Sequence, residues 1–232
     1  MTLTLFSYPQ LYNLSDNNPY GLKVATFMKL CGIPFRQEHV VDTSQAPRGQ
    51  LPYLDDDGQI IGDSDAIIAH LTTTLALTID RDLSDEQRRT DHLVRRMLDD
   101  LYWVMSYSRW RDDRFWPQFR DAFLATHPAI QPSQLEAART YNFQRYHFQG
   151  IGRYEPEAAY ARGVGDLQVL AGLLGPGPFL FGRHAHGVDA GIYGFIANIY
   201  FHQIDTPLKQ AVVGLPNLVA HCLAVHELAA AA

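Results

Sequence analysis

Every segment of this chain that has the pattern of a β-strand lies before about residue 80. Short apolar runs at residues 3–8, 35–41, 51–55 and 59–61 predict strands, and helical patterns follow the first and the last of them. The resulting order is strand, helix, strand, loop, strand, strand, helix. Only helical patterns follow, so the sequence predicts a small α/β domain and then an all-α domain.

Residues with known positional preferences mark both ends of the first helix and the turn of a hairpin. Pro19 suits the first helical position, where its missing N–H costs no hydrogen bond. Gly32 can adopt the left-handed conformation that ends a helix, and Pro34 prevents its continuation. Asp57 and Gly58 suit a tight hairpin turn, which predicts that the last two strands pair directly.

The second half of the chain contains several helix-start signals. Ser84 with Gln87 has the spacing of a capping box that opens a long helix, and Ser133 with Glu136 repeats this spacing. Further helical patterns cover about residues 156–174, 189–200 and 215–228. Residues 77–83 form the predicted linker, which places the two domains at residues 1–76 and 84–232.

Charge and composition argue against several classes of protein. The net charge of −6 and the isoelectric point near 5.9 make a nucleic-acid partner unexpected. No apolar run approaches membrane-spanning length, and the first residues lack the pattern of a signal peptide. Cys31 and Cys222 both lie in predicted helices, which favours a reducing, cytoplasmic setting. The absence of a C-x-x-C motif argues against a thiol oxidoreductase that uses its own cysteines.

Four motifs resemble the glutathione transferase superfamily: NPYGLK at 18–23, GQLPYL at 49–54, DSDAIIAHL at 63–71 and, more weakly, HGVDAGIYGF at 186–195. Within it the chain is most similar to the metaxin and failed-axon-connections branch. The resemblance covers essentially the whole chain, with the motifs in the family's order. It implies a thioredoxin-like domain that binds glutathione, a helical domain that forms an acceptor pocket, and a homodimer.

The GQLPYL motif predicts how part of glutathione is held. Pro52 is a candidate for a cis peptide bond, which the X–Pro linkage makes accessible. A cis bond would turn the N–H and C=O of Leu51 outward, and the resemblance implies that they pair with the cysteinyl part of glutathione. The alternative is an ordinary edge-strand proline with nothing bound. By analogy with the family, Gln50 could hold the glycyl end, and Arg48 lies either near the groove or in solvent.

The DSDAIIAHL motif predicts the other end of the glutathione site. Ser64 is expected to cap the helix, with its hydroxyl and the free N–H groups around it attracting a carboxylate. Asp63 can accept from an ammonium group. The resemblance implies that the two hold the zwitterionic γ-glutamyl end, and the alternative is a plain capping residue.

Asn18 falls where relatives place the residue that contacts the glutathione sulfur. An amide can donate a hydrogen bond to a thiolate, and the positive end of the helix lowers a thiol pKa further. Asn cannot form the mixed disulfide that Cys would form. The alternative is that Asn18 only caps the helix, with Tyr8, Tyr12 or Ser15 as substitutes at the sulfur.

The aromatic-rich segment at residues 99–116 predicts the acceptor pocket. Tyr102, Tyr107 and Arg109 are the candidate pocket residues, because their polar tips suit a groove wall. Trp103, Tyr107 and Trp110 share a helical face, so packing into the core is the competing interpretation.

Several other polar residues have structural interpretations. His184 and His186 form an H-x-H pair without a third ligand, so no metal site is expected. Asp189 is expected to be a structural cap, and Asp99 or Asp100 either reaches a dimer partner's glutathione or lies on a solvated face.

Two functions remain open at this point. The first is an enzyme that binds glutathione as a co-substrate and stabilises its thiolate, either for attack on a small electrophile or for reducing a disulfide or peroxide. The second is a noncatalytic adaptor of the metaxin-like type.

Overall fold

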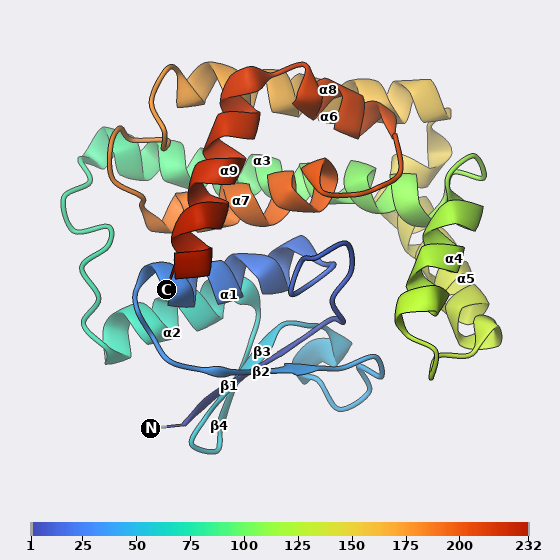
Figure 1. Ribbon diagram of the computed structural model, residues 1–232, viewed down its shortest axis with the longest axis horizontal. Helices are drawn as coiled ribbons and strands as arrows, with labels where there is room; N and C mark the ends of the chain where they lie inside the picture. The colour runs from blue at the N-terminus through green and yellow to red at the C-terminus, as the bar shows by residue number, and fades with distance from the viewer. Residues whose placement is uncertain (1, 232) are drawn as a thin grey trace.

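The computed structural model describes residues 2–231 and contains a four-stranded sheet beside a larger group of helices (Figure 1). The strands are β1 (Leu3–Ser7), β2 (Arg36–His39), β3 (Tyr53–Asp56) and β4 (Gln59–Gly62), in the spatial order β2-β1-β3-β4. β1 pairs in parallel with β2, whereas the β1–β3 and β3–β4 pairs are antiparallel. This arrangement confirms the predicted order of strands and helices and the direct hairpin between the last two strands.

Two helices, α1 (Pro19–Leu30) and α2 (Ser64–Thr74), cover one face of the sheet. The strands alternate accordingly: Leu5 and Leu54, which lie opposite each other on β1 and β3, are fully buried in the core under these helices. On the other face Phe6 stacks on Tyr53, with ring centroids 4.4 Å apart. The two helices leave their N-terminal ends at the same edge of the domain, where the candidate site lies.

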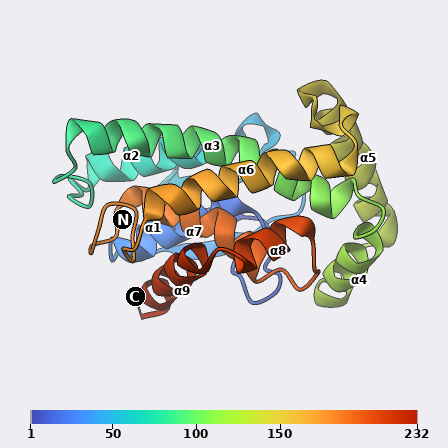
Figure 2. The same ribbon diagram turned by 90° about the horizontal axis from the view of Figure 1, so that it is seen from above.

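The all-α domain is built around two helices, α3 (Asp85–Trp110) and α7 (Gly187–Tyr200). α3 begins with the predicted capping box of Ser84 and Gln87. α7 is buried along nearly its whole length, and Figure 2 shows it among the helices that surround it. The helices α1, α3, α8 (Pro207–Val213) and α9 (Pro216–Ala231) pack against it, and the domain also contains α4 (Trp116–Thr126), α5 (Pro132–Gln149) and α6 (Pro156–Leu174).

Two predictions about the second domain need correction. The capping box of α5 is formed by Gln131 and Gln134, not by Ser133 and Glu136, because Pro132 occupies the first helical position and so shifts the cap by two residues. α4 was not predicted, because Pro117 and the aromatic residues around it obscure its helical pattern.

The two domains meet where α1 packs against α7. The approach is closest at Gly194 of α7, where an added Cβ atom would lie 2.5 Å from the carbonyl oxygen of Pro19. Arg109 of α3 also crosses the boundary and donates a hydrogen bond to the backbone carbonyl of Asn17. The loop before α1 is therefore held by both domains.

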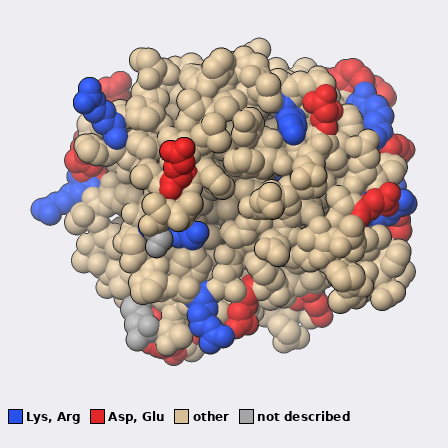
Figure 3. Space-filling view, viewed as in Figure 1, with Lys and Arg blue, Asp and Glu red and all other residues tan. Residues whose placement is uncertain are grey.

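The surface is mixed in charge. On the face of the described chain that Figure 3 shows, basic and acidic side chains are scattered among one another. Within residues 2–231, no single helix has the length and apolar composition of a membrane span. α8 and α9 pass that test only when they are taken together, with a bend of 88° between them.

Candidate functional site

A cavity of about 700 Å³ lies between the two domains. One part of its wall comes from the loop before α1, the turn before β3 and the start of α2. The other part comes from α3, α4 and α5 and is rich in aromatic side chains. Among the predicted site residues, Asn18, Gln50, Leu51, Pro52, Asp63, Ser64, Tyr102 and Arg109 all line this cavity. A cavity of this volume suits a small-molecule ligand.

Asn18 has two functional atoms with different tasks. It is the N-cap of α1, and its Oδ1 atom accepts a hydrogen bond of 3.0 Å from the backbone N–H of Tyr20. Because the oxygen must face this N–H group, the Nδ2 atom faces away from the backbone of the helix. No acceptor within residues 2–231 pairs with Nδ2, so the amide can both cap the helix and donate to a ligand. The backbone N–H of Tyr20 is therefore not available to a ligand, because Asn18 accepts it.

Buried polar groups fix the backbone on either side of Asn18. Asp16 accepts the N–H of Asn18 at 2.7 Å through Oδ1. Arg109 donates to the carbonyl of Asn17 at 2.5 Å and to the carbonyl and Oδ1 atoms of Asn198 at 2.6 and 3.1 Å. Burial raises the pKa of Asp16 well above its ordinary value and lowers the pKa of Arg109 to about 10. Arg109 therefore borders the cavity, but its guanidinium group positions the loop instead of presenting a free polar tip to an acceptor.

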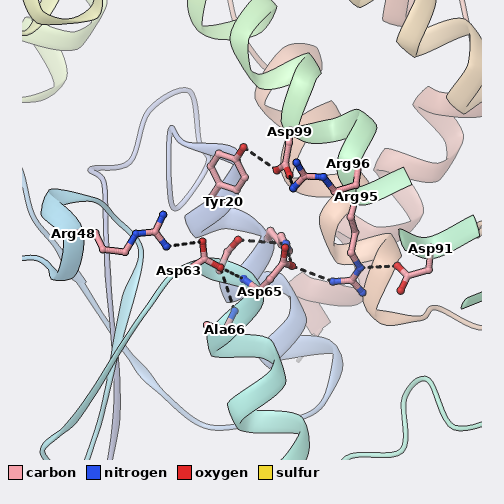
Figure 4. A network of polar contacts seen from close by, with 11 residues as sticks. Tyr20, Arg48, Asp63, Asp65, Ala66, Asp91, Arg95, Arg96 and Asp99 are labelled. Atoms are coloured by element: carbon pink, nitrogen blue, oxygen red, sulfur yellow. Dashed lines mark hydrogen bonds and ion pairs between the residues drawn. The ribbon is translucent and has the colours of Figure 1, made fainter. Parts of the chain in front are cut away.

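The start of α2 differs from the prediction in one respect. Asp63, not Ser64, is the N-cap, and its Oδ1 atom accepts the N–H groups of Asp65 and Ala66 at 3.0 and 3.2 Å. Asp63 caps the helix through its carboxylate although its backbone has a φ of 83°, outside the extended region usual for an N-cap residue. Its Oδ2 atom faces Arg48 at 3.5 Å (Figure 4). Ser64 is the first helical residue and is buried.

Ser64 contacts a buried lysine, Lys23, that was not predicted to belong to the site. The ammonium group of Lys23 donates to Ser64 Oγ at 3.3 Å and forms an ion pair with Asp65, which also pairs with Arg95. A hydroxyl oxygen that accepts from Lys23 must direct its own hydrogen elsewhere, and no acceptor for that hydrogen lies within residues 2–231. The hydroxyl and the adjacent helix N-terminus therefore offer donors to a ligand in the cavity.

The charges around Ser64 are mutually compensated. Burial lowers the pKa of Lys23, and the carboxylate of Asp65 opposes this shift. Burial by itself would raise the pKa of Asp65, but Lys23 and Arg95 outweigh it, and the pKa lies below its ordinary value. The signal in the sequence was Lys23, which lies between apolar residues in the first half of α1.

The Leu51–Pro52 peptide bond is cis, as the sequence analysis expected. Both residues are buried and line the cavity, and the neighbouring Gln50 is exposed at its edge.

The helical wall carries a chain of aromatic contacts. Tyr102 lies between Tyr20 and Trp103, with ring centroids 5.2 and 5.5 Å away. The Tyr20 hydroxyl donates to Asp99 at 3.0 Å, and Arg96 pairs with the same carboxylate at 2.9 Å (Figure 4). Asp99 thus lines the cavity of its own chain.

The prediction that Tyr107 lines the pocket is wrong. Its side chain is 3% exposed and packs against Tyr146 and Tyr160 in the core of the helical domain. Trp103 and Trp110, seven residues apart, do line the cavity, and Tyr107 is rotated away from them by part of a helical turn.

Comparisons with known proteins agree with this architecture. Residues 19–115 match the glutathione S-transferase N-terminal domain, and residues 163–225 match the glutathione S-transferase C-terminal domain. The chain belongs to the glutathione transferase superfamily. These two domain families follow each other here in the order of the two domains described above.

Two relatives of this transferase-superfamily member illustrate its range. It is 29% identical over 230 residues to an isoprene-epoxide–glutathione S-transferase from Rhodococcus sp. (strain AD45), covering 94% of each chain. It is 26% identical over 238 residues to Failed axon connections from Drosophila melanogaster, covering 94% of this chain but only 55% of that protein. The failed-axon-connections relative agrees with the branch that the motifs indicated.

Solved structures of other superfamily members share the fold. The β-etherase LigF from Sphingobium sp. strain SYK-6 superposes with a TM-score of 0.63 at 17% identity, covering the whole of both chains. A glutathione transferase family member from Pseudomonas fluorescens, solved with two glutathione molecules bound, gives a TM-score of 0.62 at 13% identity, covering 98% of this chain and 92% of that one.

A second donor faces the cavity of this transferase-superfamily member. Of the three alternatives to Asn18, Tyr8 lines the cavity, whereas Tyr12 and Ser15 do not. Burial, and then the neighbouring Tyr102, raise the pKa of Tyr8, so its hydroxyl stays protonated at neutral pH. No hydrogen-bond partner of this hydroxyl lies within residues 2–231, which leaves it available to a ligand.

The remaining candidates have structural roles. His186 contacts Asp82 at 3.2 Å, and within the described part of the chain no three His, Cys, Asp or Glu side chains gather as metal ligands would. Asp189 accepts the backbone N–H of His186 at 2.8 Å, which confirms that it is a structural cap.

Proposed function

We propose that this protein binds glutathione between its domains and stabilises the thiolate for attack on a small electrophile. The observation that carries the proposal is the convergence of two helix N-termini, each with an unpaired side-chain donor, on one cavity. The similarity over 94% of both chains to a transferase that acts on an isoprene epoxide supports this conclusion.

Glutathione would lie along the thioredoxin-like wall. Its γ-glutamyl carboxylate would accept from the hydroxyl of Ser64 and the N-terminus of α2, with Lys23 adding positive potential from below. The ammonium group would approach Asp63, and the glycyl end would approach Gln50. Leu51 would pair with the cysteinyl part.

The sulfur would then lie near the start of α1. The positive end of this helix favours a thiolate, and Asn18 Nδ2 and the Tyr8 hydroxyl are the side-chain donors that can stabilise it. Covalent catalysis through residue 18 is excluded, because Asn has no thiol. Catalysis would therefore depend on orientation and on a lowered thiol pKa.

Calorimetry with glutathione tests the binding step. Ser64→Ala is expected to weaken glutathione binding by about tenfold, because it removes a hydrogen bond to a charged group. Ser133→Ala, a substitution at an exposed residue outside the cavity, should leave binding unchanged. Thermal unfolding of each variant checks that the fold is intact. No detectable binding in the parent protein would contradict the proposal and favour an adaptor.

The ultraviolet absorbance of bound glutathione tests the sulfur contact. Asn18→Ala and Tyr8→Phe each remove one donor, and the loss of a donor to the thiolate is expected to raise the thiol pKa by about one unit. Asn18→Ser keeps both a helix cap and a donor, so its pKa should remain close to that of the parent. If neither Asn18→Ala nor Tyr8→Phe shifts the pKa, the assignment of these donors is wrong.

A noncatalytic adaptor is the second candidate, favoured by the similarity to Failed axon connections. Reduction of a disulfide or peroxide is a further use of the same thiolate.

We also propose a cytoplasmic homodimer, for which sedimentation of the purified protein tests the oligomeric state and fractionation of cells tests the location.

A further inference from the structure

Arg145 of α5 lines the cavity without a carboxylate partner. Its side chain is half-buried, and no carboxylate within residues 2–231 lies at ion-pair distance. Nη1 donates to the amide oxygen of Asn142 at 3.0 Å, and the guanidinium group also hydrogen-bonds to the side chain of Tyr102. The guanidinium carbon lies 5.2 Å from the ring centroid of Trp103 and 5.8 Å from that of Tyr141. The charge is therefore held by neutral groups alone.

The other arginines of the cavity wall are used by the protein itself. Arg48 pairs with Asp63, and Arg96 pairs with Asp99. Arg109 has its guanidinium nitrogens on backbone carbonyls and on an amide oxygen. Each of these three cations has a carboxylate or several carbonyl and amide acceptors within the chain, whereas Arg145 has no carboxylate partner and no backbone acceptor within residues 2–231.

The wall around Arg145 is aromatic and apolar. Trp103 and Trp110 from α3, Phe123 from α4 and Leu135 from α5 line the same cavity. The carboxylates of the wall are Asp63, Asp65 and Asp99, and none of the acidic side chains of α4 or α5 lines the cavity. A cation in such surroundings attracts an anion more strongly than a cation in solvent does.

We propose that Arg145 binds a carboxylate carried by the acceptor substrate, so that the preferred electrophile combines an apolar or aromatic body with a carboxylate. The inference rests on the proposed function, because it assigns the acceptor to the same cavity as glutathione. The planar guanidinium group matches a carboxylate through two parallel hydrogen bonds, and the aromatic walls accommodate the rest of the molecule.

An epoxide illustrates a balanced reaction. The glutathione thiolate attacks one ring carbon, so that a C–S bond forms and the C–O bond of that carbon breaks. The electron pair of the broken bond remains on the oxygen, and this alkoxide takes the proton that the thiol released. The product is a hydroxy thioether, and no oxidant or reductant is consumed. Arg145 takes no part in bond making, since it orients the substrate through the carboxylate.

A matched pair of electrophiles tests the inference: styrene oxide with a para-carboxylate, and the methyl ester of the same compound. In the parent protein kcat/KM should be higher for the carboxylate than for the ester. Arg145→Gln should lower kcat/KM for the carboxylate by about 10- to 100-fold and change the ester by less than about threefold. Arg145→Lys keeps the positive charge but loses the paired donors of the guanidinium group. Its kcat/KM for the carboxylate should therefore lie between those of Arg145→Gln and the parent protein.

Arg162→Gln is the control for net charge. Arg162 is exposed on α6, lies over the ring of Tyr154 and does not line the cavity. For this variant kcat/KM should equal that of the parent protein for both the carboxylate and the ester. Equal losses for carboxylate and ester in Arg145→Gln, or no preference for the carboxylate in the parent, would overturn the inference.

Calorimetry without turnover separates this inference from the proposed function. The parent should bind the para-carboxy derivative of S-benzylglutathione more tightly than S-benzylglutathione itself, and Arg145→Gln should abolish the difference. Equal binding of the two compounds, with glutathione still bound, refutes only the role of Arg145. If the parent binds no glutathione, the proposed function fails. Arg145 is then tested by NMR with para-ethylbenzoate, whose binding must disappear in Arg145→Gln or the inference fails too.

Discussion

Asp189→Ala is expected to lower the free energy of unfolding by about 3–5 kcal/mol. The Asp189 carboxylate is fully buried and accepts three hydrogen bonds, from the backbone N–H of Leu180 at 2.9 Å, from that of His186 at 2.8 Å and from His221 Nε2 at 2.9 Å. Alanine would leave these three donors in the core without an acceptor. Urea denaturation followed by circular dichroism measures the change.

Two further variants make this expectation specific. Asp121→Ala removes an exposed carboxylate that pairs with its sequence neighbour Arg120, so the stability of this variant should stay within about 0.5 kcal/mol of the parent. Asp189→Asn keeps the size of the side chain but replaces one acceptor oxygen by a donor, and it should also be clearly destabilised. A loss below about 1 kcal/mol in Asp189→Ala would show that the three donors find other acceptors.

Gly194→Ala is expected to destabilise the protein by about 3 kcal/mol and to weaken glutathione binding. The new methyl group would lie 2.5 Å from the carbonyl oxygen of Pro19 and 3.0 Å from the backbone nitrogen of Lys23. Both are backbone atoms of α1, so no flexible side chain can move aside, and α7 has to shift away from α1. Because Asn18 and Lys23 lie at this junction, the shift would also change the cavity.

Gly165→Ala on α6 is the matched control for this prediction. Nothing lies within 4 Å of a Cβ atom built at Gly165, so alanine should stabilise the helix there by up to about 1 kcal/mol. The two glycine variants are therefore expected to change stability in opposite directions. Denaturation curves and glutathione calorimetry on both proteins provide the comparison, and an unchanged stability in Gly194→Ala would show that the helices separate at little cost.

The parts of the site that depend on neighbouring residues were predictable from the sequence. Asn18 and Pro19 indicated the start of α1, and Ser84 with Gln87 indicated the start of α3, because caps act within one helical turn. The GQLPYL motif indicated the position of the cis bond at Pro52. Local signals failed where two adjacent residues compete, as with Asp63 and Ser64, since both are good caps.

By itself the sequence determined the order of strands and helices, the two-domain architecture and the residue that opens α1 at the cavity, because hydrophobic periodicity and capping act over short distances along the chain. Only the tertiary structure decided which charges neutralise one another. Lys23, Ser64, Asp65 and Arg95 meet from three different helices, and Tyr107 turns into the core while its neighbour Trp103 lines the cavity. Packing places the aromatic rings of Trp103 and Tyr141, and no carboxylate within residues 2–231, next to Arg145. No pattern along the chain encodes such contacts between distant side chains.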